Sequence, residues 1–418
     1  MRAHCFIFAL LSLRVIKVYG APSDATALPS CAIACDNDLS SDCSMSNATS
    51  CFCGSSSRPK ALLDCVEMNC TPKQLFTTTR LYEKECGITP RKGPPVVSGE
   101  ALACLILASF FFVARIIAKS MGLAGGWGWD DYTIIAAYIL GVAIYVLHLY
   151  LIRFGFGKNI WDLPFPTITT FYQYFQAEAV IYKAQISLAK ISVCLFLLRI
   201  FQSRTFRYLT YALIGINSAV GITWALVDAL RCWPARLTYT GWTKEEPGYC
   251  IDFEAAVLVN CLVNIIVDFI IIVVPVSEVL QLQLPRLKKL SVALMFLMGS
   301  VLWIIAVIRA VVFWNHRAGS NETLGLHPLM HWSVIETQIA VMCACLPAFR
   351  ALISQWFPAL LGNTTRRTYA SGTAGQYNKM PPGSDNINKS VTYTVNYESR
   401  SVTNSDVELL GLGPKQHQ

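Results

Sequence analysis

The sequence predicts an all-α membrane protein, in which a seven-transmembrane helical bundle follows a small disulfide-stapled helical domain. Three observations predict this class. Charged residues make up only 14% of the 418 residues and the mean hydropathy is +0.45, which is outside the range of ordinary soluble chains. Seven apolar runs have roughly the 20 residues that a helix needs to cross a bilayer. Eight of the sixteen cysteines lie close together near the N-terminus.

Residues 1–20 are expected to form a secretory signal peptide. A short apolar run follows Arg2 and is too short to span a bilayer as a helix. A retained signal anchor is the alternative, because Arg14 and Lys17 are late charges for a cleaved signal. In both cases the segment 21–92 is expected on the extracellular side.

The segment 21–92 carries a cysteine framework. An even number of cysteines in an oxidising compartment favours disulfides, which stabilise small domains by about 2–4 kcal/mol each. Zinc is the competing use, but the segment has no His and lacks paired C-x2-C knuckles. We therefore expect four disulfides of unspecified connectivity, formed by Cys31, Cys35, Cys43, Cys51, Cys53, Cys65, Cys70 and Cys86.

The order of "PSCAIAC", "CFC" and "CVEMNC", followed by Cys86, resembles the CFEM domain of fungal extracellular membrane proteins. The resemblance implies a small helical basket, and in some members haem bound through an Asp between the third cysteine and the C-x-C pair. Asn47 stands in that interval here, and Asp42, one residue outside it, is the candidate substitute. Because a carboxamide carries no charge to offset ferric iron, we expect weak or absent haem binding.

Three sequons are candidate glycan acceptors, at Asn47, Asn69 and Asn321. A glycan on Asn47 would place sugar over the face where the family binds haem. This position therefore favours a glycosylated recognition module over a haem-capturing one.

From residue 97 onward the apolar runs predict a bundle over 97–353. Basic residues crowd alternate connections, which predicts an extracellular N-terminus and a cytoplasmic C-terminus at the plasma membrane. The formal charge of +8 is spread over these connections, so it indicates orientation and not nucleic-acid binding. The expected spans are 97–118, 132–152, 169–199, 208–230, 253–276, 290–314 and 331–353.

The segments around these spans lead to three further expectations. Cys232 and Cys250 share one outer loop and are expected to form a disulfide there. Residues 354–418 are rich in Gly, Ser, Thr and Asn and predict a disordered cytoplasmic tail. Asp130 and Asp131 are expected to cap the second span rather than react.

Charged and amide side chains inside the spans are the functional candidates, because such groups are costly in lipid and usually face protein or a cavity. One interpretation is a polar network that binds a ligand or switches between two packings. The other is a set of interhelical clasps, for instance Arg309 with Asp268 or Glu336. The candidates are Glu178, Lys183, Lys190, Asp228, Asn264, Asp268, Arg309 and Glu336.

Several stretches resemble the fungal rhodopsin-domain family, namely "WGWDDY", "KISVCLFLLRIF", "NIIVDFIIIVVPV", "LPRLKKL" and "IETQIAVMCACLPAFR". The resemblance implies a receptor-like protein of the kind associated with surface sensing and appressorium formation, and a heterotrimeric G protein as partner. The last span has no Lys for a retinal Schiff base, so light-driven pumping is not expected. No acidic residue directly precedes Arg199, so the familiar animal receptor lock is missing.

The leading expectation is a plasma-membrane receptor-like sensor of extracellular or host-surface cues. A haem or iron acquisition receptor and a membrane transporter are the alternatives. No HExxH, GxSxG or phosphate-binding glycine loop occurs, so enzyme activity is not expected. The expected partners are the lipid bilayer, an unidentified extracellular ligand and the G protein.

Overall fold

The computed structural model of the chain describes residues 27–39, 53–54, 57–123, 126–201, 203–281, 286–316 and 321–356. All of them belong to the first of two units into which the chain divides, 1–364 and 365–418. The predicted signal peptide, the haem-ligand position Asn47 and its candidate substitute Asp42 lie outside the described residues. So do Cys43, Cys51 and nearly all of the predicted tail.

The N-terminal domain consists of three helices, α2 (Ser30–Leu39), α4 (Ser57–Asn69) and α5 (Pro72–Glu85). A capping box begins α5, because the Thr71 hydroxyl accepts from the Gln74 amide while the Gln74 side chain accepts from the Thr71 amide. Pro72 occupies the first turn, where its missing N–H costs nothing. These local signals fix where α4 ends and α5 begins.

Disulfides hold these three helices together around a small core. The core is formed by Ala32, Cys35, Leu62 and Val66, which is too little apolar surface to stabilise a domain of this size alone. Three disulfides join the described cysteines, and they are Cys31–Cys70, Cys35–Cys65 and Cys53–Cys86. The first links α2 to the residue that follows α4, the second links α2 to α4, and the third links Cys53, which precedes α4, to the residue that follows α5.

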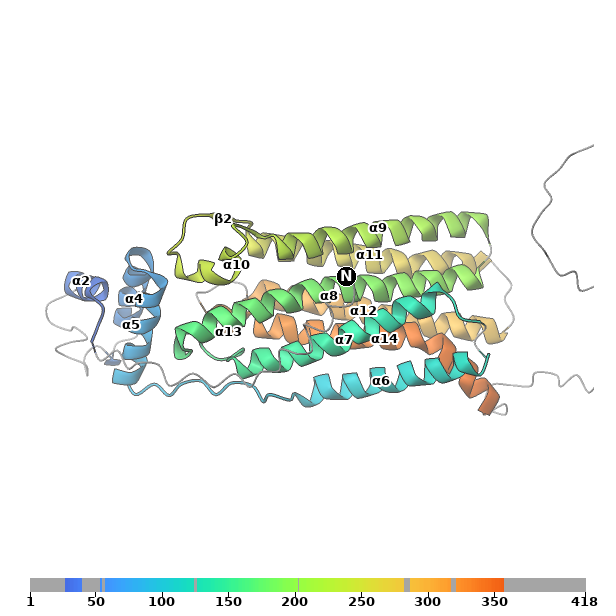
Figure 1. The fold of residues 1–418 in the computed structure, drawn as a ribbon, viewed down its shortest axis with the longest axis horizontal. Coiled ribbons are helices and arrows are strands. Elements are labelled where there is room, and N and C mark those ends of the chain that lie inside the picture. Colours follow the sequence, from blue (N-terminus) through green and yellow to red (C-terminus); the bar gives the residue numbers. More distant parts are fainter. Residues whose placement is uncertain are drawn as a thin grey trace, which may run out of the picture. The chain divides into compact units, whose positions relative to one another are not determined.

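Seven helices are long and apolar enough to cross a membrane, and Figure 1 shows them running side by side. The predicted fold class is confirmed. Most helices begin three or four residues earlier than their predicted spans, because polar residues of the first turn continue the helix outside the apolar run. The helices are α6 (Gly99–Ser120), α7 (Trp129–Arg153), α8 (Phe165–Ile200), α9 (Arg204–Ala229), α11 (Phe253–Gln281), α12 (Arg286–His316) and α14 (His327–Trp356).

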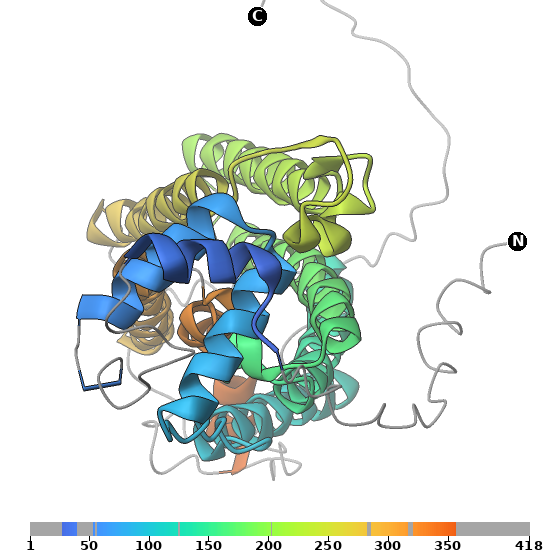
Figure 2. The same ribbon diagram turned by 90° about the vertical axis from the view of Figure 1, so that its left-hand side faces the viewer.

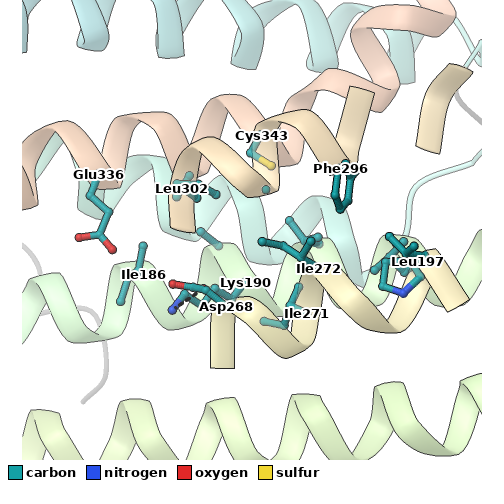
Figure 3. A pocket seen from close by; sticks show the side chains of 16 residues that line it. Ile186, Lys190, Leu197, Asp268, Ile271, Ile272, Phe296, Leu302, Glu336 and Cys343 are labelled. Carbon is teal, nitrogen blue, oxygen red and sulfur yellow. Dashed lines mark ion pairs between the residues drawn. The ribbon is translucent and has the colours of Figure 1, made fainter. Parts of the chain in front are cut away.

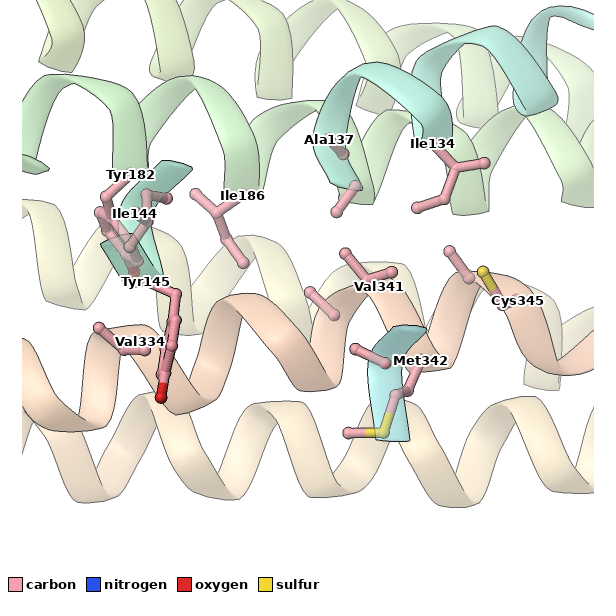
Figure 4. Packing of buried hydrophobic residues seen from close by; sticks show 14 of the residues in the cluster. Ile134, Ala137, Ile144, Tyr145, Tyr182, Ile186, Val334, Val341, Met342 and Cys345 are labelled. Atoms are coloured by element: carbon pink, nitrogen blue, oxygen red, sulfur yellow. The ribbon is translucent and has the colours of Figure 1, made fainter. Parts of the chain in front are cut away.

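The last helix is the centre of the bundle. α14 contacts α6, α7, α8 and α12, and the end-on view in Figure 2 shows its orange ribbon enclosed by the others. Its candidate span is 72% buried, against 17% for that of α9. Figure 4 shows the main core, in which Val341 and Cys345 of α14 pack towards Ile134 of α7 and Ile186 of α8. A helix so enclosed is where buried polar side chains can meet partners from several neighbours.

Short elements close one end of the bundle. They are η1 (Ile160–Asp162), β1 (Cys232–Trp233), α10 (Leu237–Thr240), η2 (Gly241–Thr243), β2 (Tyr249–Cys250) and α13 (Glu322–Gly325). β1 and β2 pair antiparallel with Cys232 opposite Cys250, and these two cysteines form a disulfide. The strands lie outside the all-α expectation, but they contain two residues each.

The N-terminal domain contacts this end, which we call the domain-side end. Phe76 of α5 stacks on Trp242 of η2 with ring centres 6.0 Å apart. Arg80 of α5 donates from Nε to the carbonyl oxygen of Trp161 (2.8 Å) and from Nη2 to that of Leu163 (3.0 Å). The other end of the bundle, where α6 ends and α7 begins, is called the opposite end.

Candidate functional site

Lys190 of α8 is the centre of a buried polar group inside the bundle. Its ammonium lies 2.8 Å from Asp268 Oδ1 and donates to Asn264 Oδ1 at 2.9 Å, both on α11. Asn264 in turn donates to the backbone and side-chain oxygens of Asn260 at 2.9 Å. The four-residue spacing of Asn264 and Asp268 places both on the face of α11 that meets α8.

A second group lies between α12 and α14. Arg309 Nη1 is 3.1 Å from Glu336 Oε2, and the same oxygen accepts from the Tyr182 hydroxyl at 2.9 Å. The guanidinium carbon also lies 5.0 Å from the centre of the Tyr182 ring, a distance suited to a cation–π contact. Of the two clasps considered for Arg309, the structure forms the one with Glu336.

Two further candidates have weaker partners. Lys183 Nζ lies 3.9 Å from Asp228 Oδ2 across α8 and α9, which is a loose ion pair. Glu178 lies elsewhere on α8, with its Oε1 3.4 Å from Nδ1 of His148 on α7. The structure therefore divides the eight candidates into small separate groups: one of three residues around Lys190, two pairs, and Glu178, whose partner His148 is not among the candidates.

A cavity adjoins the Lys190 group between α8, α11, α12 and α14. Its empty volume, including the open side, is about 780 Å³. Figure 3 shows Lys190 and Asp268 at its wall, Glu336 on α14 apart from them, and apolar side chains such as Ile272 and Phe296 lining the remainder. The cavity thus combines an apolar wall with a few charged groups, which is the usual composition of a small-molecule site.

The backbone of α11 is weakened where it lines this cavity. Pro275 lies inside the helix and has no N–H, so the carbonyl of Ile271 loses its usual helical partner. Both residues line the cavity. This half of α11 can therefore bend at lower cost than an uninterrupted helix.

The structure brings together a charge cluster at the opposite end that the sequence did not reveal. Arg115 of α6 is 2.7 Å from both Asp130 Oδ2 and Asp131 Oδ1 of α7, and Lys119 is 2.9 Å from Asp131 Oδ2. Arg199 of α8 approaches Asp130 Oδ1 at 3.2 Å. We call these five residues the opposite-end cluster.

The expectation that Asp130 and Asp131 simply cap the second span was incomplete. Asp131 does accept the Gly128 amide at 3.0 Å, as a capping side chain would. Both carboxylates are nevertheless buried, because α6 supplies Arg115 and Lys119 to pair with them. Arg199 also finds its acidic partner on α7 and not beside itself in sequence.

Two carboxylates outside the candidate spans lie where the N-terminal domain meets the bundle. Burial raises the pKa of Glu83 on α5, and the nearby Asp162 carboxylate adds to the rise. Burial also raises the pKa of Asp162 in η1. This contact therefore favours the protonated forms of both groups.

The glycan acceptors are placed differently. Asn69 is exposed at the end of α4. Asn321 is partly buried, and its amide donates to Asn159 Oδ1 at 3.0 Å while its oxygen accepts from the Ile160 amide. A glycan on Asn321 would replace one of these contacts, and glycosylation at both positions stays a prediction.

Family models match two parts of the chain. The CFEM domain model matches residues 24–87, and the fungal rhodopsin domain model matches residues 114–355. The second match covers more than half of the chain and includes the described residues from the end of α6 to α14. No solved structure matches the chain.

Several curated fungal proteins are similar to part of the chain. A polyenoic acids biosynthesis gene cluster protein, Ba17b of Metarhizium anisopliae, is 28% identical over 48% of this chain and 57% of its own length. A SAT4 family membrane protein of Emericella nidulans is 25% identical over 49% of this chain and 50% of its own length. The chain thus spans about half the length of these two relatives.

A longer match is to a protein named as a receptor. Receptor GIN3 of Arthrobotrys oligospora is 23% identical over 69% of this chain and 71% of its own length. These similarities support a multi-pass membrane protein of a receptor-like class.

Proposed function

The chain belongs to the fungal rhodopsin domain family, and from this premise we propose that it is a receptor-like sensor of extracellular or host-surface cues. In this proposal it resides in the plasma membrane, with its CFEM domain outside the cell and its C-terminus in the cytoplasm. Similarity to a protein named as a receptor supports the receptor-like class. The cue, the membrane and the orientation are part of the proposal.

The observation that carries the proposal is the Lys190–Asp268 pair at the wall of an apolar cavity. A purely structural ion pair would be enclosed by packed side chains. Here a ligand in the cavity, or a bend of α11 near Pro275, changes the surroundings of both charges. Because interactions of charges are strong where water is scarce, a small shift between α8 and α11 alters the balance between two packings of the bundle.

The contacts of the CFEM domain supply a route from an external cue to this cavity. Phe76 touches η2, which lies in the loop closed by the Cys232–Cys250 disulfide. α11 begins at Phe253, three residues after Cys250, and it carries Asp268. A displacement of α5 is therefore transmitted through a short, cross-linked loop to the helix that lines the cavity.

A cavity-filling substitution tests this function. Ala340 lines the cavity from α14, so Ala340→Leu should occupy part of the space and strongly reduce the response to a surface cue, read from a transcriptional reporter in the native fungus. Ala219→Leu adds the same atoms to an exposed position of α9 and should respond normally. Both proteins need to reach the plasma membrane in equal amounts. A normal response of Ala340→Leu would contradict the proposal.

A heterotrimeric G protein is the partner that we propose for the opposite end. Arg204 and Arg207 are exposed at the start of α9, near Arg199 in sequence, and they offer a basic surface to an acidic partner. The α subunit should co-purify from native membranes with the wild-type chain and be depleted with Arg204→Gln/Arg207→Gln. Equal recovery with both chains, or none with either, would argue against this partner.

A further inference from the structure

The cavity between α8, α11, α12 and α14 is elongated, and its polar groups lie towards one end. Its wall on α8 runs from Ile186 to Leu197, which is roughly 16 Å along the helix axis. Figure 3 shows the Lys190–Asp268 pair towards one end, with Leu197 and Phe296 at the other. The cavity therefore matches a long molecule with a single polar end.

The charges at the polar end balance each other. Among the described residues that line the cavity, only Lys190, Asp268 and Glu336 are charged. Lys190 pairs with Asp268 at 2.8 Å, and Glu336 pairs with Arg309 of α12 at 3.1 Å. An additional charge from a ligand would have no buried partner of opposite sign, and an uncompensated buried charge is strongly destabilising. The polar end therefore favours a neutral head group over a carboxylate or an ammonium group.

Hydrogen-bonding capacity remains at this end. An ammonium group has three N–H donors, and among the described residues that of Lys190 meets two acceptors, Asp268 and Asn264. A hydroxyl group can accept the third N–H of Lys190 and donate to a carboxylate oxygen of Asp268 or Glu336 at the same time. A ketone or ester oxygen can only accept, so a hydroxyl group matches this end more fully.

The apolar end is narrow, and it opens to the outside of the bundle. Phe296 lines the cavity and is 46% exposed, so the open side lies at this part of α12. Ile272 Cγ1 lies 3.1 Å from the position that a Cβ on Gly299 would take, so α11 and α12 are already in contact beside the cavity. A single extended chain fits such a space better than a broad ring system does. It can also enter from the hydrocarbon of a bilayer without crossing water.

We propose that this cavity binds an uncharged amphiphile, with one hydrocarbon chain and a hydroxyl group at its end. The hydroxyl group lies beside Lys190 and the lining carboxylates, and the chain extends past Ile272 towards Phe296 and Leu197. The choice of this cavity rests on the sensor function proposed above. A chain that occupies the space beside Pro275 fills the volume into which α11 would bend, so binding of the amphiphile favours one packing of the bundle.

Photo-cross-linking of the full-length chain in lipid nanodiscs tests the site. The probe is decanol that carries a diazirine near the end of its chain, and mass spectrometry locates the label. We expect saturable labelling of cavity residues on α8, α11 and α14, whereas exposed residues of α9 report non-saturable labelling from the bilayer. Ala340→Leu should lower the saturable labelling about tenfold or more, since one apolar group in a pocket has an effect of this size. Ala219→Leu should leave it unchanged.

Competition on the wild type tests the head group and does not depend on a variant that folds. Decanol, decanoic acid and decylamine share one chain, but at about pH 8.5 they are neutral, negative and positive. Decanol should displace the probe at a concentration at least about tenfold below the other two, because these bring an unpaired charge into the site. The proposal is overturned by wild-type protein without saturable labelling in the cavity, by equal labelling of Ala340→Leu, or by equal displacement with a charged competitor.

Binding is measured without a cellular response, so the ligand class and the sensor function can fail separately. Loss of the reporter response in Ala340→Leu, without saturable labelling of the wild type by the decanol probe, would refute the ligand class and keep the sensor function. Saturable and decanol-selective labelling, with a normal reporter response of Ala340→Leu, would keep the ligand class and refute the sensor function.

Discussion

Buried charges at the opposite end of the bundle are fully paired, whereas those nearer the domain-side end are not. In the opposite-end cluster, Asp130 and Asp131 face Arg115 and Lys119, with Arg199 at the edge. Nearer the other end, Arg309, His148 and Glu178 keep polar atoms without hydrogen bonds among the described residues. Both regions place charges in a membrane-spanning bundle, but only one satisfies all of them with described residues of the chain.

This difference indicates two roles for charged side chains inside the bundle. A saturated cluster, in which every charged group already has a partner, has no free polar atom for a ligand, so its role is to hold α6, α7 and α8 in one arrangement. An unsaturated group costs stability until something else completes it. We therefore assign the opposite-end cluster to structure. Ligands are to be sought in the cavity beside Lys190, where open space adjoins a charged pair, and among the unsaturated groups nearer the domain-side end.

The largest effect is expected from breaking the saturated cluster. Asp131→Asn removes one of two carboxylates and leaves Lys119 with Asp130 at 3.8 Å as its remaining acidic partner. Because an uncompensated buried charge costs about 3–5 kcal/mol, we expect a large loss of folded protein and a much lower unfolding temperature in detergent. Glu254→Gln, at an exposed position of α11, is the control. Equal stability of the two variants would show that the cluster is not a clasp.

The second effect concerns the loop that links the CFEM domain to α11. The Cys232–Cys250 disulfide closes an 18-residue separation, so its loss should cost on the order of 3 kcal/mol if restriction of the unfolded chain is its main contribution. Cys232→Ser/Cys250→Ser should therefore lower the unfolding temperature and loosen η2, measured by hydrogen exchange. The matched control is Cys104→Ser, which removes a cysteine outside any disulfide. Labelling of both thiols in unreduced wild type would contradict the bond itself.

The sequence alone was sufficient to predict the fold. It was not sufficient to predict which buried side chains pair with each other. Apolar runs and cysteine spacing gave the bundle and the stapled domain, because length and composition decide whether a helix can cross a bilayer. The pairing of Arg309 with Glu336 instead of Asp268 depends on how α12 rotates against α14. No sequence pattern records that rotation.

The sequence analysis missed other residues for the same reason, namely that their partners lie on helices distant in sequence. The four-residue spacings of Arg115 with Lys119 and of His327 with His331 were visible, and each places two side chains on one helical face. What was not visible is that α7 brings Asp130 to the first pair and His148 to the second. Contacts between helices distant in sequence had to come from the structure.

A smaller effect of pH is expected where the CFEM domain meets η1. The raised pKa values of Glu83 and Asp162 mean that the folded contact binds protons more tightly than the separated groups. Its extra stability is fully present below the ordinary values of 4.5 and 3.8 and is lost as pH rises through the raised values. The protection of the α5 amides, measured relative to their intrinsic exchange rate at each pH, should therefore rise on acidification from pH 7. Glu83→Gln should flatten this dependence, and an unchanged profile in that variant would exclude Glu83 as its source.

The smallest effect is expected from the exposed ion pair between the same two parts. Lys73 Nζ lies 2.6 Å from Glu245 Oε1, as close as the pairs of the opposite-end cluster, but the side chains are 37% and 55% exposed. Water screens both charges and already solvates each of them, so such pairs contribute about 0–1 kcal/mol. A double-mutant cycle with Lys73→Ala and Glu245→Ala, followed by thermal unfolding, should give a coupling energy in that range, far below the loss for Asp131→Asn. A coupling of several kcal/mol would show that burial does not set the strength of ion pairs in this protein, and the comparison between its two ends would fail.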